Sequence, residues 1–304
     1  HRDLHLSIRR QRQMCIRDRL KVMKSIVIFG GAGFVGSNLC HHILDKHDPK
    51  EIWIIDNLLS SEISNVPEDS KVKFIFGSVA DDRVLAKLPD DLELVFHLAC
   101  YHGNQSSIAD PIADHDNNTI TSLKLFDHLK TSKNLKKIVY AAAGCAVAEK
   151  TFEDATATSE DAPVSLFHDS PYSISKLVGE MYGNYYWTRH QLPFVKARFQ
   201  NVYGPREISS GKYATLIALF AEKMRKGELL GVVSPGDQQR NFTHVSDIIS
   251  GLELVGEHGV GDDYGIGHPQ AFSIMEIAKM FGGKIEMLAE RPGNRMAAEV
   301  ITEK

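Results

Sequence analysis

The sequence has few cysteines and lacks any long apolar run. Its four cysteines, Cys15, Cys40, Cys100 and Cys145, are too scattered for the paired spacing of a zinc site or a disulfide framework. No window reaches the roughly 18 consecutive apolar residues that a membrane-spanning helix needs. We therefore expect a protein of the reducing cytoplasm that has no metal site and no membrane association.

Beyond its first 22 residues, the chain has no excess of basic residues. Residues 1–22 hold seven Lys/Arg and two Asp/Glu, a net charge of +5, whereas the whole chain carries −4 and its remainder therefore −9. An acidic globular part is not expected to bind nucleic acid. Because residues 14–19 resemble translated sequencing-adapter sequence, we interpret residues 1–22 as a non-native, poorly ordered extension before Met23. A basic interaction arm is the alternative.

A glycine-rich turn follows the first apolar segment. Residues 25–29 predict a strand, and a helix is expected to run from the turn through Leu44. Gly30 permits a tight turn, Gly33 lets the backbone approach a pyrophosphate, and Gly36 allows close packing of helix and strand. The helix N-terminus would face the phosphates, so the pattern predicts a nucleotide-binding βα unit.

An acidic residue ends the second predicted strand. Residues 52–55 are apolar, and Asp56 follows them, twenty residues after Gly36. A carboxylate at this place accepts hydrogen bonds from the adenosine ribose and repels a 2′-phosphate. Asp56 therefore favours NAD over NADP; a purely structural role is the alternative.

Strands and helices alternate through the first part of the chain. Further strands are expected at residues 72–76, 94–98 and 138–140. With a helical pattern at 118–129, this alternation predicts an α/β fold with a doubly wound, Rossmann-type parallel sheet. Since such a sheet binds its ligand at the carboxyl ends of its strands, residues 98–105 and 141–148 should line the cleft.

A tyrosine and a lysine, Tyr172 and Lys176, stand four residues apart in the stretch YSISK. Pro171 before them suits a helix start, so both side chains share one helix face. A phenol with a pKa of about 10 is a poor base at neutral pH, but a neighbouring ammonium and the positive charge of nicotinamide stabilise its phenolate. The pair is therefore a candidate acid and base; a surface pair without function is the alternative.

Eight stretches of the chain carry motifs that belong together. They include GGAGFVGSN at 30–38, RFQNVYGP at 198–205 and RNFTHVSD at 240–247. The others lie at 56–57, 97–99, 116–118, 172–176 and 291–293. With these stretches the chain resembles, from Met23 to its end, the extended short-chain dehydrogenase/reductase family, in its branch of NAD-dependent nucleotide-sugar epimerases and dehydratases.

The resemblance implies a Rossmann domain at residues 23–200 and a smaller C-terminal α/β substrate-binding domain at 201–304, with some later segments returning to the first domain. It also implies a tightly held NAD and a nucleotide-sugar substrate. A homodimer is expected, in which the helices at 118–129 and 172–189 pack together; packing of their apolar residues into the core is the alternative. Relatives continue with further helices, so we expect that Lys304 marks a truncated read.

The resemblance also assigns site residues. Tyr172 would be the general base and acid, and Lys176 would hold the nicotinamide ribose and lower the pKa of Tyr172. Asn201, Arg240 and Arg291 match positions that grip the diphosphate or nucleoside of the substrate, which suits the planar fork of arginine. A turn cap and solvated surface charges are the alternatives. The cofactor-binding residues would be Gly30, Gly33, Phe34, Val35, Gly36, Asp56, Asn57, Ser78, Val79, Leu98, Ala99, Tyr172 and Lys176.

The chain departs from the family pattern at several positions, and these departures limit the reactions that we expect it to catalyse. Residues 141–145, AAAGC, stand where relatives carry a Ser or Thr that bonds the reacting hydroxyl. Either Tyr172 acts alone, Cys145 or a water substitutes, or activity is reduced or absent. Relatives that eliminate water use an acidic pair where this chain has Gly144 and Cys145, so dehydration is disfavoured. Ser78 replaces an Asp that bonds adenine, but it still accepts a hydrogen bond.

The predicted reaction is epimerisation of a nucleotide-diphosphate sugar through a keto-sugar, with C4 of a UDP-hexose as the favoured centre. Tyr172 would remove the hydroxyl proton while hydride passes to NAD and then returns to the opposite face. A reductase or dehydrogenase of the same family and a catalytically weak NAD-binding regulatory protein are the alternatives. The sugar is left open, because it depends on the loops at 101–107 and 206–215. Candidate sugar contacts, with plain loop roles as the alternative, are Tyr101, His102, Asn104, Gln105 and Ser107.

Overall fold

The computed structural model describes residues 25–144, 158–159, 166–199, 201–262, 264–290 and 300–301. Residues 1–22, Cys145 and Arg291, for which the sequence makes predictions, lie outside the described residues. Among the helices that are described, none combines the length and the apolar character needed to cross a membrane.

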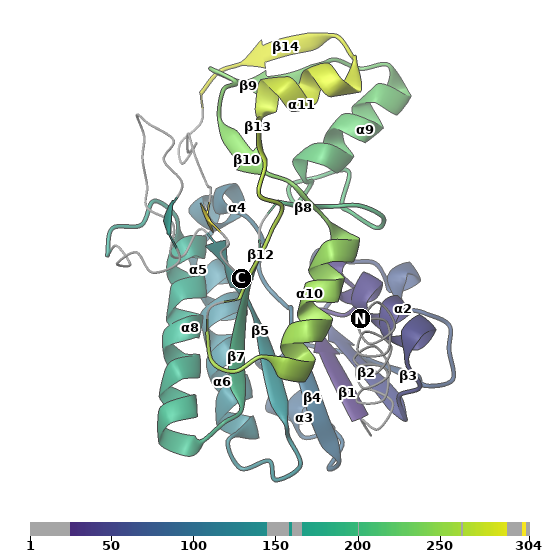
Figure 1. Ribbon diagram of the computed structural model, residues 1–304, viewed down its shortest axis with the longest axis vertical. Helices are drawn as coiled ribbons and strands as arrows, with labels where there is room; N and C mark the ends of the chain where they lie inside the picture. The colour runs from purple at the N-terminus through teal and green to yellow at the C-terminus, as the bar shows by residue number, and fades with distance from the viewer. Residues whose placement is uncertain are drawn as a thin grey trace, which may run out of the picture.

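A seven-stranded sheet forms the centre of the molecule (Figure 1). In spatial order its strands are β12 (Gly265–Ile266), β7 (Phe194–Phe199), β5 (Lys137–Ala143), β4 (Leu92–His97), β1 (Ser25–Phe29), β2 (Glu51–Asp56) and β3 (Val72–Phe76). Every neighbouring pair is parallel. The strand order reverses between β1 and β4, and ligands bind such sheets at the carboxyl ends of the strands beside the reversal. The predicted doubly wound α/β fold is confirmed.

Helices cover both faces of the sheet. They are α2 (Phe34–Lys46) and α10 (Val245–His258) on one face, and α6 (Thr121–Leu129) and α8 (Pro171–His190) on the other. Ile26 and Ile28 of β1 pack with α2 and α10. Val27 and Phe29 pack with α6 and α8. Because side chains of a strand point alternately to opposite faces, an unbroken apolar run such as β1 is typical of a sheet covered on both sides.

A smaller α/β unit stands beyond one end of the sheet, at the top of Figure 1. It consists of α9 (Leu216–Lys226), β9 (Leu230–Val233), β10 (Gln239–Asn241), β13 (Ala271–Ser273), α11 (Ile274–Phe281) and β14 (Ile285–Leu288). β9 pairs in parallel with β14, and β10 pairs antiparallel with β13, around a core that includes Phe220, Leu230 and Ile277. Between β10 and β13 the chain leaves this unit to form α10 and β12, so later segments return to the sheet.

The remaining elements are short. They are η1 (Ile63–Asn65), α3 (Asp82–Leu85), α4 (Asn104–Ala109), α5 (Pro111–Asp114), η2 (His115–Ile120), β6 (Thr158–Ser159), β8 (Val202–Tyr203), β11 (Thr243–His244) and β15 (Val300–Ile301). β8 pairs with β11, and β6 pairs with β15. β8 follows β7, and β11 precedes α10. The pairing of β8 with β11 therefore links two segments of the chain that connect the sheet to the second unit.

Several elements differ in their bounds from the prediction, most of all one strand and one helix. The strand expected at residues 138–140 continues further, because Ala141, Ala142 and Ala143 pair with β7. Tertiary pairing here overrides the weak strand preference of alanine. The helix expected at 118–129 begins earlier, since the π-helical turn η2 leads directly into α6.

Two glycines let α8 lie close to the sheet. A Cβ added at Gly179 would come closer than 3.0 Å to the hydroxyl of Tyr140. A Cβ added at Gly183 would come equally close to the ring of Phe194. Protein interiors are close-packed, so neither position has room for a side chain. Glycine therefore fixes how closely α8 approaches β5 and β7.

We expect Gly183→Ala to destabilise the protein, because the new methyl group overlaps Phe194. Overpacking of a core costs about 1–3 kcal/mol, which outweighs the gain of up to about 1 kcal/mol from replacing a helical glycine. Urea unfolding measures the change in the free energy of unfolding. Asn184→Ala, at an exposed neighbour on the same helix, is the control and should not lower it. An alanine variant at residue 183 as stable as the wild type would contradict this account of the packing.

Candidate active site

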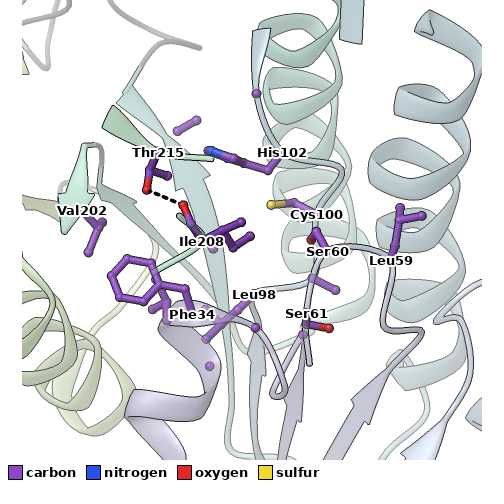
Figure 2. A pocket seen from close by; sticks show the side chains of 18 of the residues that line it. Phe34, Leu59, Ser60, Ser61, Leu98, Cys100, His102, Val202, Ile208 and Thr215 are labelled. Atoms are coloured by element: carbon purple, nitrogen blue, oxygen red, sulfur yellow. Dashed lines mark hydrogen bonds between the residues drawn. The ribbon is translucent and has the colours of Figure 1, made fainter. Parts of the chain in front are cut away.

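A cavity of about 480 Å³ opens at the carboxyl ends of the sheet strands (Figure 2). Its walls come from the segments after β1 to β5, from the start of α8 and from the second unit. The predicted site residues that line it are Gly30, Gly33, Phe34, Val35, Gly36, Asp56, Asn57, Ser78, Val79, Leu98, Ala99, Tyr172, Lys176, Asn201 and Arg240. Arg291, the remaining predicted residue, lies outside the described residues.

The glycine-rich turn brings three backbone segments together. Gly30 has a φ of +78°, and a Cβ there would lie 2.7 Å from the amide nitrogen of Ala99. A Cβ on Gly36 would come closer than 3.0 Å to the carbonyl oxygen of Gly30. Among the described side chains, none caps the first turn of α2, which lines the cavity. Its amide groups are therefore available as donors to an anionic group.

The carboxylate of Asp56 organises this turn from the end of β2. It accepts a hydrogen bond from the amide of Ala32 at 3.0 Å. Two more come from the amide of Leu58 at 2.9 Å and the hydroxyl of Ser61 at 2.8 Å. A fixed negative charge at this point accepts hydrogen bonds from hydroxyl groups and repels phosphate. The turn therefore suits a ribose with free hydroxyls.

Tyr172 and Lys176 lie in the first two turns of α8. The helix begins there because Ser170 caps its first turn and Pro171 occupies an early position where the missing amide hydrogen is no loss. Lys176 is buried, and its Nζ lies 4.7 Å from the ring centroid of Tyr140 in a cation–π arrangement. Both Tyr172 and Lys176 reach the cavity. The fold thus brings a phenol and an ammonium group to one wall.

Buried polar groups behind α8 hold this wall in place. Asn118 accepts a hydrogen bond from the amide of Tyr101 at 2.7 Å and donates one to the hydroxyl of Ser175 at 3.2 Å. It also donates to the carboxyl of Asp114 at 2.9 Å. Burial raises the pKa of Asp114 despite this hydrogen bond. Through Asn118, the loop after β4 and the helix that carries Tyr172 form one hydrogen-bonded unit.

The end of β5 contributes only small side chains to the cavity. Residues 141–144 are three alanines and a glycine, so they offer no hydroxyl. His102 faces Tyr172, with ring centroids 6.2 Å apart and an interplanar angle of 83°. His102 also lines the cavity, and desolvation and, after it, the charge of Lys176 lower the pKa of its imidazole. His102 can therefore donate or accept a hydrogen bond beside Tyr172.

Asn201 and Arg240 add polar groups where the second unit closes the cavity. Asn201 has a φ of +48°, and its buried Nδ2 has no hydrogen-bond partner in the described part of the chain. Arg240 donates to the carbonyl of Gln239 at 2.6 Å. An amide donor and a guanidinium suit oxygen-rich, anionic groups.

Glu207 and its surroundings were not predicted as site residues from the sequence. The Glu207 carboxylate accepts from the amide of Gly204 at 3.2 Å and from the hydroxyl of Thr215, and burial raises its pKa. Figure 2 shows the bond of 3.4 Å from Thr215 to the carbonyl of Ile208. Other cavity residues without a site prediction are Ile55, Leu59, Ser60, Ser61, Gly77, Asn117, Thr121, Phe199, Val202, Leu216, Ile217 and Phe242. The sequence indicated that the loop at 206–215 shapes the pocket, but no motif in it identifies which of its residues contact a ligand.

The five candidate sugar contacts lie in the loop after β4 and in α4, and only some of them line the cavity. His102 and Asn104 line the cavity, whereas Gln105 is not among the lining residues. Tyr101 and Ser107 are buried instead, and the ring of Tyr101 packs 5.9 Å from that of Tyr213. Gly103, which lies between these residues and precedes α4, has a φ of +99°, a conformation that favours glycine.

The sequence model of the NAD dependent epimerase/dehydratase family matches residues 26–267. The chain belongs to this family, whose relatives here are NAD-dependent nucleotide-sugar epimerases and dehydratases. It is therefore an enzyme with NAD as its cofactor. The family, the enzyme class and the cofactor predicted from the sequence are confirmed.

Relatives with known names or structures cover most of the chain. The UDP-glucose 4-epimerase of Mycolicibacterium smegmatis is 28% identical over 265 residues, which is 85% of this chain and 82% of that protein. The enzyme WbmF of Bordetella bronchiseptica, in complex with NAD+, is 40% identical with a TM-score of 0.78 over 92% of this chain and 84% of WbmF. The UDP-glucose 4-epimerase of Thermotoga maritima, with UDP-glucose, is 25% identical with a TM-score of 0.84 over 92% of this chain and 90% of that one.

Gly36→Ala should weaken NAD binding, because the added methyl group meets the backbone of Gly30 and displaces the first turn of α2. An overpacking cost of about 1–3 kcal/mol corresponds to a loss of about 5- to 150-fold in affinity. Isothermal titration with NAD measures the change. His41→Ala, at a half-buried position further along α2, should bind NAD as the wild type does. Equal affinity of the Gly36→Ala variant and the wild type would show that the turn does not hold the cofactor.

Proposed function

We propose that this enzyme is an epimerase of nucleotide-diphosphate sugars that acts through a keto-sugar, and that it inverts C4 of a UDP-hexose. The observation that carries the proposal is a single cavity, which holds the Tyr172–Lys176 pair, the glycine-rich turn and the polar groups of Asn201 and Arg240. The named relatives support it, because the M. smegmatis and T. maritima proteins are UDP-glucose 4-epimerases.

The cofactor half of the cavity fits NAD. The uncapped first turn of α2 would hold the diphosphate, and Asp56 would bind the adenosine ribose. Ser78 would accept a hydrogen bond from the adenine, and Lys176 would hold the nicotinamide ribose. When bound, NAD supplies reversible two-electron redox chemistry at a sugar carbon.

Tyr172 is the proposed acid and base. Its Oη would take the proton of the substrate hydroxyl and return it at the end of the turnover. Lys176, held against the ring of Tyr140, would place a positive charge beside the phenol and favour the loss of its proton. His102 would hydrogen-bond the reacting hydroxyl from across Tyr172, in place of a Ser or Thr at the end of β5. Asn201 and Arg240 would hold the diphosphate of the substrate.

The acids that line the cavity support epimerisation over loss of water. Elimination needs a carboxyl within hydrogen-bond reach of the leaving hydroxyl. Among the described lining residues, the carboxyl groups are those of Asp56 and Glu207. Asp56 is bonded within the cofactor turn, and Glu207 is bonded to Gly204 and Thr215. Both carboxyl groups are therefore already engaged by donors of the protein.

We also propose a homodimer that pairs α8 with its counterpart in a second copy. Ile174, Met181 and Tyr185 are 47%, 60% and 53% exposed. Residues seven and eleven positions apart lie on the same helix face, so the three form an apolar stripe. Such a stripe is stabilised when a partner removes it from water. A monomer mass by light scattering would contradict the dimer.

Proton NMR tests the proposed reaction. The purified protein with catalytic NAD is mixed in turn with uridine, guanosine, thymidine and cytidine diphosphate sugars. A product of unchanged mass and inverted C4 is expected from a UDP-hexose. Net accumulation of NADH would instead identify a reductase or dehydrogenase. NAD binding without turnover of any sugar would favour the regulatory alternative, and Ala143→Ser would then test whether a missing hydroxyl is the cause.

Tyr172→Phe should lower turnover by about 10²–10⁴-fold, the usual contribution of a positioned acid and base. NAD binding should persist, because the ring remains in the wall. The matched control is Tyr182→Phe, which removes a hydroxyl from a half-buried position of the same helix outside the cavity lining and should leave turnover unchanged. Wild-type turnover by the Tyr172→Phe enzyme would assign the proton transfer to another group.

A further inference from the structure

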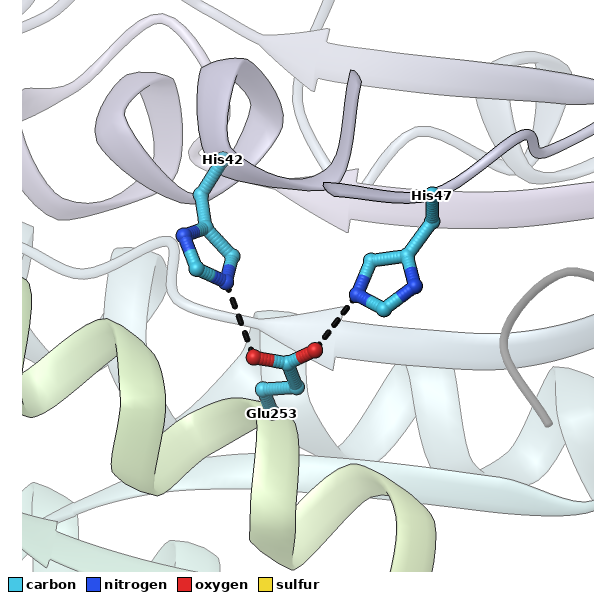
Figure 3. A group of neighbouring side chains, drawn as sticks. All are labelled: His42, His47 and Glu253. Atoms are coloured by element: carbon cyan, nitrogen blue, oxygen red, sulfur yellow. Dashed lines mark hydrogen bonds and ion pairs between the residues drawn. The ribbon is translucent and has the colours of Figure 1, made fainter. Parts of the chain in front are cut away.

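Two histidines and a glutamate meet between α2 and α10 (Figure 3). His42 lies in α2, His47 follows the last residue of that helix, and Glu253 lies in α10. Nε2 of His42 is 2.8 Å from one carboxylate oxygen of Glu253, and Nε2 of His47 contacts the other. One donor atom from each of the three side chains lies within 4.8 Å of the other two.

The cluster is shielded from solvent and contains a negative charge. The side chains of His42, His47 and Glu253 are 23%, 3% and 17% exposed. Each oxygen of the Glu253 carboxylate lies against Nε2 of one of the two imidazoles. Within the described chain, the ion-pair partners of Glu253 are these two histidines and no lysine or arginine. A cation between the three side chains would balance the charge.

We propose that His42, His47 and Glu253 form a site for a divalent metal ion, with Zn²⁺ as the fitting ion. Two imidazole nitrogens and a carboxylate are ligands that zinc takes in proteins. Zinc holds them at about 2.0–2.2 Å in a tetrahedron, which places neighbouring donor atoms roughly 3.3 Å apart. The donor atoms of the cluster already lie within 4.8 Å of one another. Small rotations of the side chains, with a water as fourth ligand, would complete the site.

The metal would act on the packing of the fold and not on the reaction. Among the described cavity residues, none belongs to this cluster. His47 and Glu253 are 206 positions apart, so the ion would join α2, which begins at the glycine-rich turn, to α10. The sequence predicts no metal site, because ligand spacing is visible only within one segment. Here a distant helix supplies the carboxylate.

Titration of the full chain with ZnCl₂ tests the proposal. After metals are removed with EDTA, calorimetry should show one saturable site per chain, and Zn²⁺ should raise the unfolding temperature. Glu253→Gln keeps the shape of the side chain and its capacity to hydrogen-bond, but it removes the charge. This variant and His47→Gln should bind Zn²⁺ at least about tenfold more weakly, since even the loss of an outer partner of a metal ligand costs about that much.

His41→Gln is the matched control, because His41 neighbours His42 in α2 but is not part of the cluster. It should bind Zn²⁺ as the wild type does. Absence of saturable binding by the wild type, or equal affinity in Glu253→Gln, would overturn the proposal and leave a metal-free hydrogen-bonded clamp. Crystals soaked in Zn²⁺ give a readout that needs no variant. An anomalous peak among the three side chains is expected, and peaks only elsewhere would overturn the site.

Discussion

The contact between backbone segments at the glycine-rich turn constrains the whole cavity. Gly30 touches the chain at Ala99, and Gly36 touches Gly30, with no side chain between them. At the ends of β1 and β4 and at the start of α2, the backbones are therefore in direct contact and leave no room for a side chain. These are also the strands between which the sheet order reverses. The cofactor half of the cavity takes its shape at this point, and the other walls are placed around it.

A second close approach places the wall of the proposed acid and base. Tyr140 of β5 lies against Gly179 through its hydroxyl and against Lys176 through its ring. One side chain of the sheet thus sets both the distance of α8 and the position of the ammonium group. Asn118 adds hydrogen bonds from the loop after β4 to the same helix. The wall is rigid because packing and hydrogen bonding fix it from two elements.

Sequence signals that lie within one segment predicted much of this arrangement. The strand at residues 72–76, the glycine-rich turn and the start of α8 at Pro171 are each encoded by adjacent residues. The rest depends on partners that are distant in sequence. Ala143 joins β5 only because β7 pairs with it, and Glu207 reaches the cavity only because the loop after β8 folds over it. The cluster around Glu253 has no local pattern for the same reason. Such features follow from tertiary pairing, which overrides local preference.

The path of the chain limits how the two units can move. It passes between the sheet and the second unit after β8, between β10 and β11, and after β12. In a hinge motion, a few residues of a connecting segment change their backbone dihedral angles. Here all three connections would have to change at the same time for the two units to rotate. A fragment cut at residue 200 would also lose α10 and β12, which belong to the sheet. The two units are therefore topologically interlaced, and neither is an excisable module that evolution or an experimenter could exchange as one continuous segment.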